Sequence, residues 1–159
     1  HRQDRQLPQE EAWALLTQGT YGVLSVVGDE GWPYAVPMHY TVMDGQIYLH
    51  CAKTGYKLDA IARDDRVCFT VTLREELVQD HATSLYESVV VLGRAALVTD
   101  QATHQAALAH LVDALGRVSP DLRDQYIARR GQNTAVLVIR PVHLTGKAKR
   151  DFRPIQQRM

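Results

Sequence analysis

Histidine, cysteine, glycine and lysine gather in the stretch HCAKTGYKLDAI at residues 50–61, and these residue types can hold a small anion. A strand is expected to end at His50 and Cys51, after which Gly55 lets the backbone turn sharply into a helix. The first turn of that helix offers unpaired N–H groups and the positive end of the helix dipole. Lys57 adds a full charge there, so the stretch has the parts of a phosphate site. An ordinary strand-to-helix turn with a solvated lysine has the same pattern.

The strands and helices expected around this stretch give a fold that is mainly β with peripheral helices, of the α+β class. Strands are expected over 20–27, 32–43, 46–51, 66–73, 86–99 and 134–147. Helices are expected after Pro8, over about 55–63, after Asp100 and after Ser119. Asp-Gly at 44–45 is a two-residue hairpin signal, and such closely spaced strands favour an antiparallel barrel over βαβ units. The polar stretch 74–84 is expected to be a loop.

Strand alternation decides which side chains of the third strand share a face. It places Tyr48 and His50 on one face and Leu49 and Cys51 on the other. The preceding strand, 32–43, carries two prolines, each of which removes a ladder donor. That strand is therefore expected to be irregular or to lie at an edge.

Length and charge exclude several classes of protein. The chain has 159 residues, which predicts one domain over 1–159, with a core at about 10–147 and a polar tail over 148–159. Eighteen basic side chains balance 18 acidic ones, whereas nucleic-acid binders carry a basic surplus. The opening residues are polar and no apolar run approaches the length of a membrane span, so we expect a cytoplasmic protein with no nucleic-acid or membrane partner. The two cysteines lack zinc-ligand spacing, and no metal site is expected.

Four segments, in their order and spacing, carry a resemblance to a known family. These are PYAVPMHY at 33–40, YLHCAKTGYKLDAI at 48–61, YESVVVLGRA at 86–95 and VLVIRPVHLTGK at 136–147. Together they resemble the flavin-binding split-barrel superfamily of pyridoxamine phosphate oxidase, and within it most the nitroimidazole-resistance (Nim-type) branch. The resemblance extends over roughly 10–147 and implies an antiparallel six-stranded split β-barrel of the FMN-binding type.

The resemblance also implies a set of FMN contacts. It assigns them to Pro37, Met38, His39, Tyr40, His50, Cys51, Gly55, Tyr56, Lys57 and Ser88. The backbone of the first four would run along the isoalloxazine ring, and the two residues at the strand end would lie beside the ribityl chain and phosphate. The glycine turn would hold the phosphate, with Lys57 as its cation, and Ser88 would lie near the flavin on a later strand.

This chain departs from the oxidase branch in three ways. It has Cys51 where that branch has a hydroxyl residue, and Gly55 and Tyr56 where that branch has a serine and an arginine. A thiol is a weak hydrogen-bond donor, so fewer strong phosphate donors remain. The tail, GKAKRDFRP, also lacks the substrate-binding arginine and histidine pattern of the oxidase. We therefore do not expect a vitamin phosphate oxidase.

The Nim-type resemblance implies an FMN-dependent oxidoreductase that reduces small aromatic compounds such as nitroimidazoles, with His50 as its catalytic residue. It further implies a homodimer with the flavin in the groove between subunits. Two alternatives stay open. One is a non-catalytic flavin-binding or regulatory protein. The other is a split-barrel relative that binds a deazaflavin, or haem with His50 or His143 as axial ligand.

Overall fold

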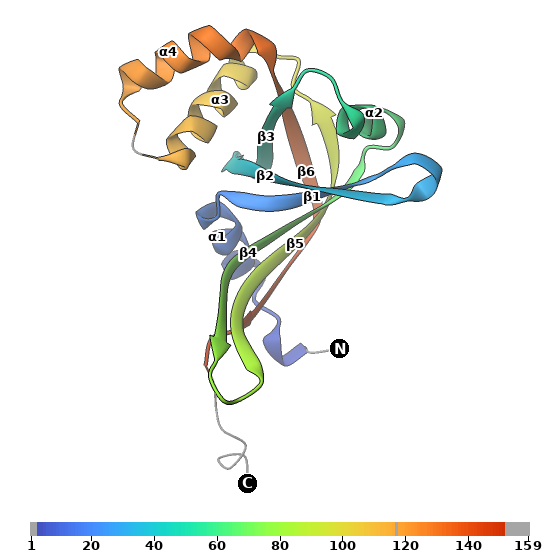
Figure 1. Ribbon diagram of the computed structural model, residues 1–159, viewed down its shortest axis with the longest axis vertical. Coiled ribbons are helices and arrows are strands. Elements are labelled where there is room, and N and C mark those ends of the chain that lie inside the picture. The colour runs from blue at the N-terminus through green and yellow to red at the C-terminus, as the bar shows by residue number, and fades with distance from the viewer. Residues whose placement is uncertain (1–2, 117, 152–159) are drawn as a thin grey trace.

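Six strands form the centre of the computed structural model, which describes residues 3–116 and 118–151 (Figure 1). The strands are β1 (Tyr21–Val27), β2 (Pro33–Met43), β3 (Gln46–Ala52), β4 (Arg66–Val78), β5 (Thr83–Leu97) and β6 (Thr134–Lys149). All neighbours are antiparallel, and the order β1-β2-β3-β6-β5-β4 closes on itself as a barrel. The predicted antiparallel six-stranded barrel is confirmed.

Helices lie at the ends and the side of this barrel. They are α1 (Gln9–Gln18), α2 (Tyr56–Arg63), α3 (Gln101–Leu115) and α4 (Pro120–Arg130), with short 3-10 turns η1 (Gln3–Arg5), η2 (Asp29–Gly31) and η3 (Gly131–Asn133). The predicted N-caps are confirmed: the Asp100 side chain accepts from the Thr103 N–H at 2.8 Å, and that of Ser119 from the Leu122 N–H at 3.4 Å. Among residues 3–116 and 118–151, no helix has both the length and the apolar character that a membrane crossing requires.

The barrel interior is filled by every second residue of each strand. Leu24, Phe69, Val91 and Leu144 lie in register across β1, β4, β5 and β6, and all four are buried. Leu16 of α1 is fully buried in the same core, so this helix closes one end of the barrel. Burial of alternate residues is the physical origin of the register.

A second, smaller core lies between β3 and the helical hairpin formed by α3 and α4. Tyr48 and Val136 pack there with Leu108 of α3. Tyr48 therefore faces the hairpin while Leu49 faces the barrel interior, as the strand alternation predicted.

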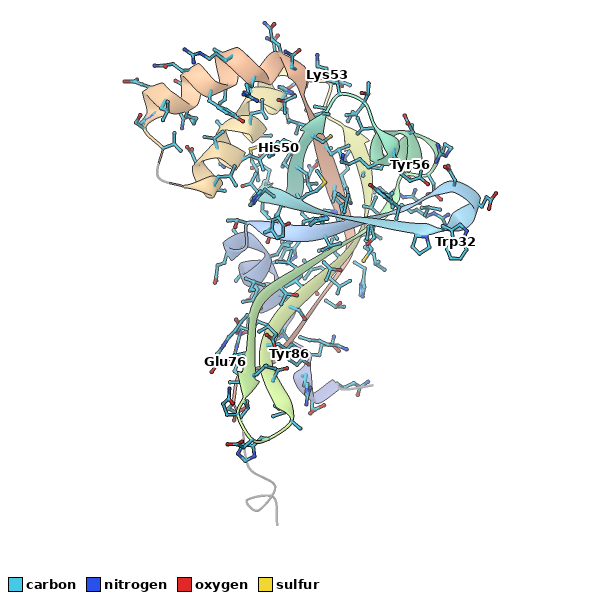
Figure 2. The ribbon with its side chains drawn as sticks, viewed as in Figure 1. Trp32, His50, Lys53, Tyr56, Glu76 and Tyr86 are labelled. Carbon is cyan, nitrogen blue, oxygen red and sulfur yellow. The ribbon has the colours of Figure 1, made fainter. Side chains whose placement is uncertain are left out.

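The stretch 74–84, predicted as a loop, instead continues β4 and β5 as an arm, which β6 joins at Tyr86 and Glu87 and which is two-stranded beyond them. The arm extends away from the barrel to a turn at 79–82, and Figure 2 places Glu76 and Tyr86 on it. Both faces of the arm carry polar side chains, so the apolar alternation that marks a strand is absent from its sequence. Strand β6 likewise reaches Lys149, into the predicted tail at 148–159; residues 152–159 of that tail lie outside the described residues.

Candidate functional site

Strand β2 changes its pairing partner halfway along its length. It pairs with β1 from Pro33 to His39 and with β3 only from Tyr40 to Met43, and the last pair is Tyr40 with Leu49. From there β3 pairs with β6 alone. The proline-bearing half of β2 is thus paired on one side, where missing N–H donors are tolerated, in agreement with the predicted edge or irregular character.

The separation of the two strands leaves a hollow of about 300 Å³, which we call the β2–β3 hollow. It is lined by Tyr21, Val36, Pro37, Met38, His39, His50, Cys51, Ala52 and Lys57. Six of the ten residues singled out in the sequence therefore meet here: three from β2, two from the end of β3 and Lys57 from the first turn of α2.

Tyr21 lines the hollow although sequence reasoning did not single it out. It is opposite His39 in the β1–β2 ladder, and the two rings meet edge to face with centroids 4.9 Å apart. The Nδ1 atom of His39 lies 3.1 Å from the Thr20 carbonyl oxygen, which holds that ring in place. The signal in the sequence was an aromatic residue near the start of a predicted strand. Its position opposite His39 comes from the β1–β2 register.

His50 is the most distinctive side chain of the hollow. Within the described part of the chain, its Nδ1 is the one buried side-chain nitrogen or oxygen without a hydrogen-bond partner. Burial, reinforced by repulsion from the charged form of His39, lowers the pKa of His50 below its ordinary value of 6.5. The ring is therefore neutral at neutral pH. Figure 2 shows it on β3, on the side where α3 lies.

Cys51 and Lys57 form the other side of the hollow. Burial raises the pKa of the Cys51 thiol, and the nearby ammonium of Lys57 opposes this shift only in part. The thiol is thus protonated at neutral pH. Lys57 is half-buried, and no carboxylate among residues 3–116 and 118–151 forms an ion pair with it. A half-buried cation without an anionic partner is suited to an anionic ligand.

The turn before α2 has a backbone conformation that requires glycine. Gly55 has φ 139° and ψ 163°, a region open to glycine and essentially closed to other residues. Its carbonyl accepts from the N–H groups of Leu58 at 2.9 Å and Asp59 at 3.2 Å, which begins the helix. The first N–H groups of an α-helix have no helical carbonyl one turn earlier to bond to. Those of Tyr56 and Lys57 are therefore directed out of the N-terminus of α2.

Two of the singled-out tyrosines use their side chains for structure. Tyr40 is 1% exposed, and its hydroxyl donates to the Leu16 carbonyl at 2.6 Å, which ties β2 to α1. Tyr56 is directed to the β1–β2 loop, where its hydroxyl accepts from the Asp29 N–H at 2.8 Å. Neither side chain lines the hollow.

Ser88 lies apart from the hollow within one chain. It pairs with Thr72 of β4 and Lys147 of β6, on the outward side of the barrel wall. Its half-buried side chain has no contact with the lining of the β2–β3 hollow.

Comparison with solved structures shows the same fold in other proteins. A candidate 5-nitroimidazole antibiotic resistance protein from Bacteroides thetaiotaomicron is 22% identical, with a TM-score of 0.73 over 90% of this chain and 86% of its own. The conserved protein Rv2991 from Mycobacterium tuberculosis is 17% identical, with a TM-score of 0.80 over 98% of both chains. A FAD-binding protein from Mesorhizobium loti is 23% identical, with a TM-score of 0.67 over 91% of this chain and 97% of its own.

Sequence comparison identifies the family. No curated protein sequence matches the chain significantly. The model of the pyridoxamine 5'-phosphate oxidase family, however, matches residues 8–148, which include the whole barrel and all four α-helices apart from the last strand residue. The ordered motifs, the six-stranded barrel and this match agree, and the chain belongs to the pyridoxamine 5'-phosphate oxidase family.

Proposed function

We propose that this protein binds FMN in the β2–β3 hollow and uses it to reduce small aromatic compounds such as nitroimidazoles. The observation that carries the proposal is the meeting of Lys57, in the helical turn that follows Gly55, with His50, whose Nδ1 has no described partner, around one hollow. Two of the structural neighbours support it, since one is a FAD-binding protein and another is a candidate nitroimidazole resistance protein.

The phosphate end of the ligand fits the α2 side of the hollow. A phosphate ester carries nearly two negative charges, and the Lys57 ammonium has no carboxylate partner among the described residues. The outward N–H groups of the first helical turn add donors of the kind that phosphates use. The Cys51 thiol is a poor donor, so Lys57 carries most of the electrostatic attraction.

The ring end of the ligand fits along β2. From Pro33 to His39 this strand pairs with β1 alone, so its other edge offers backbone groups to the donor and acceptor edge of a flavin ring. The Tyr21–His39 ring pair adds an aromatic wall at the same end. Pro37, Met38 and His39 of this segment belong to the stretch, Pro37 to Tyr40, whose backbone would run along the isoalloxazine by the family resemblance.

The outward face of β1, β4, β5 and β6 is suited to be the contact surface of a homodimer. Two in-register rows of that face are made almost entirely of apolar and small uncharged side chains: Val23, Thr70, Val90 and Thr145, then Ser25, Cys68, Leu92 and His143. Val90 is 36% exposed and Leu92 48%, which is a large apolar exposure for a wall that no helix of residues 3–116 and 118–151 covers. A second copy would bury this face.

Ser88 gains a role in such a dimer. It lies one strand step from Val90 on the same outward face, and Tyr21 of the hollow shares the outward side of β1 with Val23. A partner subunit on this face therefore lies beside the hollow, where its Ser88 can add a polar contact to the flavin.

The bound flavin would supply two-electron transfer, and the residues of this chain supply its surroundings. The apolar barrel wall excludes water from one side of the hollow. His50, neutral at neutral pH, presents a nitrogen that can hold or release a proton at the substrate. Reduction of a nitro group to a nitroso group takes two electrons and two protons and releases water, so a proton carrier is needed.

Titration with FMN and riboflavin tests the phosphate site. Lys57→Gln should weaken FMN binding by about 10- to 100-fold, because a charge-assisted hydrogen bond contributes about 1.5–3 kcal/mol, and should leave riboflavin binding unchanged. Lys53→Gln is the matched control, since Lys53 is exposed in the same loop and does not line the hollow. Equal losses for FMN and riboflavin would reject the phosphate role.

Turnover decides between enzyme and carrier. FMN-loaded protein with a nicotinamide donor should consume a nitroimidazole, and this should be measured as loss of nitro-group absorbance. FMN binding without turnover would favour the non-catalytic flavin-binding alternative. A strong Soret band in purified protein would favour haem.

A further inference from the structure

A second hollow lies between the two helices of the α3–α4 hairpin and meets the first one at His50. It has a volume of about 370 Å³, and we call it the α3–α4 slot. A volume of this size is within the range of small-molecule sites in proteins. The hairpin packs on β3, and the slot opens between its two helices in addition to that contact.

The walls of the slot are apolar. Leu108, Val112 and Leu115 follow one another at helical spacing along one side of α3, and Leu122 faces them from α4. Leu115 is 51% exposed and Leu122 is 58% exposed. Leucine side chains left open on both sides of a hollow favour an apolar occupant, since its binding would remove their surface from water.

Thr134 and His50 bring polar groups to the end of the slot at the barrel. The Thr134 hydroxyl donates to the Arg130 carbonyl at 2.9 Å, and Thr134 is opposite Ala52 in the β3–β6 ladder, two residues after His50. The backbone of Arg130 is therefore near the end of the slot at which His50 lies. The Arg130 guanidinium carbon lies 6.0 Å from the centroid of the Tyr126 ring, which holds the cation against the slot.

The charges of the lining select the kind of molecule. His50, Tyr126 and Arg130 are its only ionisable side chains among the described residues, and no carboxylate faces it. An anionic or strongly hydrogen-bond-accepting group is thus favoured at the barrel end, while a cation would find no partner. His50 lines this end, and its imidazole, whose buried Nδ1 has no partner within the described chain, can turn a ring nitrogen toward such a group.

His50 lines both the slot and the β2–β3 hollow. A molecule in the slot with its polar group at His50 would therefore place that group beside a ligand in the hollow. The structure contains no other described residue that is common to the two linings.

The geometry points to the α3–α4 slot as the binding site for a small aromatic molecule that bears an apolar substituent and one anionic or accepting group. Its polar group lies at His50 and Arg130, and its substituent lies between the leucines of α3 and α4. Its role as the compound that is reduced rests on the function proposed above. The inference deepens that function, because it adds an apolar chain to the substrate class.

Calorimetric titration with para-alkylbenzoates tests the site without turnover. For FMN-free and FMN-loaded protein, affinity should rise about twofold to fourfold for each methylene from para-toluate through para-propylbenzoate to para-pentylbenzoate. Leu115→Gln and Leu122→Gln should reduce this rise to less than twofold in total. Leu77→Gln is the matched control, a 70% exposed leucine on the distant β4–β5 arm that should keep the full rise.

The charged end is tested by changing the ligand and the arginine separately. Arg130→Gln should weaken para-pentylbenzoate about tenfold and leave para-pentylbenzyl alcohol unchanged, whereas Arg129→Gln, next to it and outside the lining, should change neither. In the wild type, para-pentylbenzylamine should bind more weakly than both. Equal binding of the amine and the benzoate would overturn the anionic specificity.

The outcomes separate this inference from the proposed function. Absence of a chain-length effect in the wild type, or its persistence in Leu115→Gln and Leu122→Gln, would overturn the slot even if FMN binds and nitroimidazoles are reduced. A chain-length effect that the leucine variants abolish would support the slot even if FMN fails to bind, and that failure would overturn the proposed function alone.

Discussion

His39 and His50 lie on either side of the point where β2 and β3 separate, since they are the first residues beyond the last direct pair of the two strands, Tyr40 and Leu49. The burial of His50 lowers the pKa of its ring, and repulsion from the charged form of His39 lowers it further. The candidate site is thus located at a change of strand pairing, where the barrel leaves backbone and side chains without internal partners.

His50 should make the protein less stable in mild acid. Its pKa is about 6.5 when unfolded and lower when folded, so as pH falls below about 6.5 the unfolded state takes up the proton first and the free energy of unfolding decreases. His50→Gln should reduce this decrease, as measured by urea unfolding between about pH 7.5 and pH 5. His110→Gln, an exposed histidine of α3, should leave it unchanged. An identical decrease in His50→Gln and wild type would contradict the shift.

Gly55→Ala should lower the free energy of unfolding by about 1–3 kcal/mol, because φ 139° with ψ 163° is strained for alanine although the Cβ would meet no atom within 4 Å. It should also weaken FMN binding. Gly45→Ala is the matched control: Gly45 has φ 71° in the β2–β3 turn, also with nothing within 4 Å. It should cost about 1 kcal/mol without changing FMN affinity. Thermal unfolding and fluorescence titration measure both quantities.

Tyr40→Phe should destabilise the fold and leave the site intact. The change removes the buried hydrogen bond to the Leu16 carbonyl and leaves that carbonyl without its donor, which amounts to about 1–2 kcal/mol. FMN affinity should stay within about twofold, because the Tyr40 ring faces the core and Tyr40 does not line the hollow. A large loss of FMN affinity at unchanged stability would show that the side chain belongs to the site.

Leu92→Glu should convert the proposed dimer into a monomer, because it places a charge at the centre of an apolar face. Sedimentation velocity should show the change, and FMN affinity should fall with it if the partner's Ser88 contributes. Leu77→Glu, at a more exposed leucine of the arm, should leave both properties unchanged. A wild-type monomer would contradict the proposed dimer, and a dimer that Leu92→Glu leaves intact would place the partner contact elsewhere.

The local parts of the site could be predicted from the sequence. Strand alternation decided that His50 faces away from Leu49, and the glycine followed by a helical first turn located Lys57 at a helix N-terminus. Both features arise within a few residues, where backbone sterics and side-chain period suffice. The caps at Asp100 and Ser119 were readable for the same reason. Ordered motifs then predicted the barrel, because they preserve the spacing of whole elements.

Contacts between segments that are far apart in the chain bring these parts together, and the sequence did not reveal them. Tyr21 joins His39 through the β1–β2 register, and Tyr56 is drawn to the β1–β2 loop, by contacts between segments far apart in the chain. The stretch 74–84 forms strands because β4 and β5 supply each other's backbone hydrogen bonds there, although its polar sequence predicted a loop. Arg130 comes to the His50 end through helix packing on β3. Such placements depend on which apolar faces are buried together, and this is a property of the whole chain.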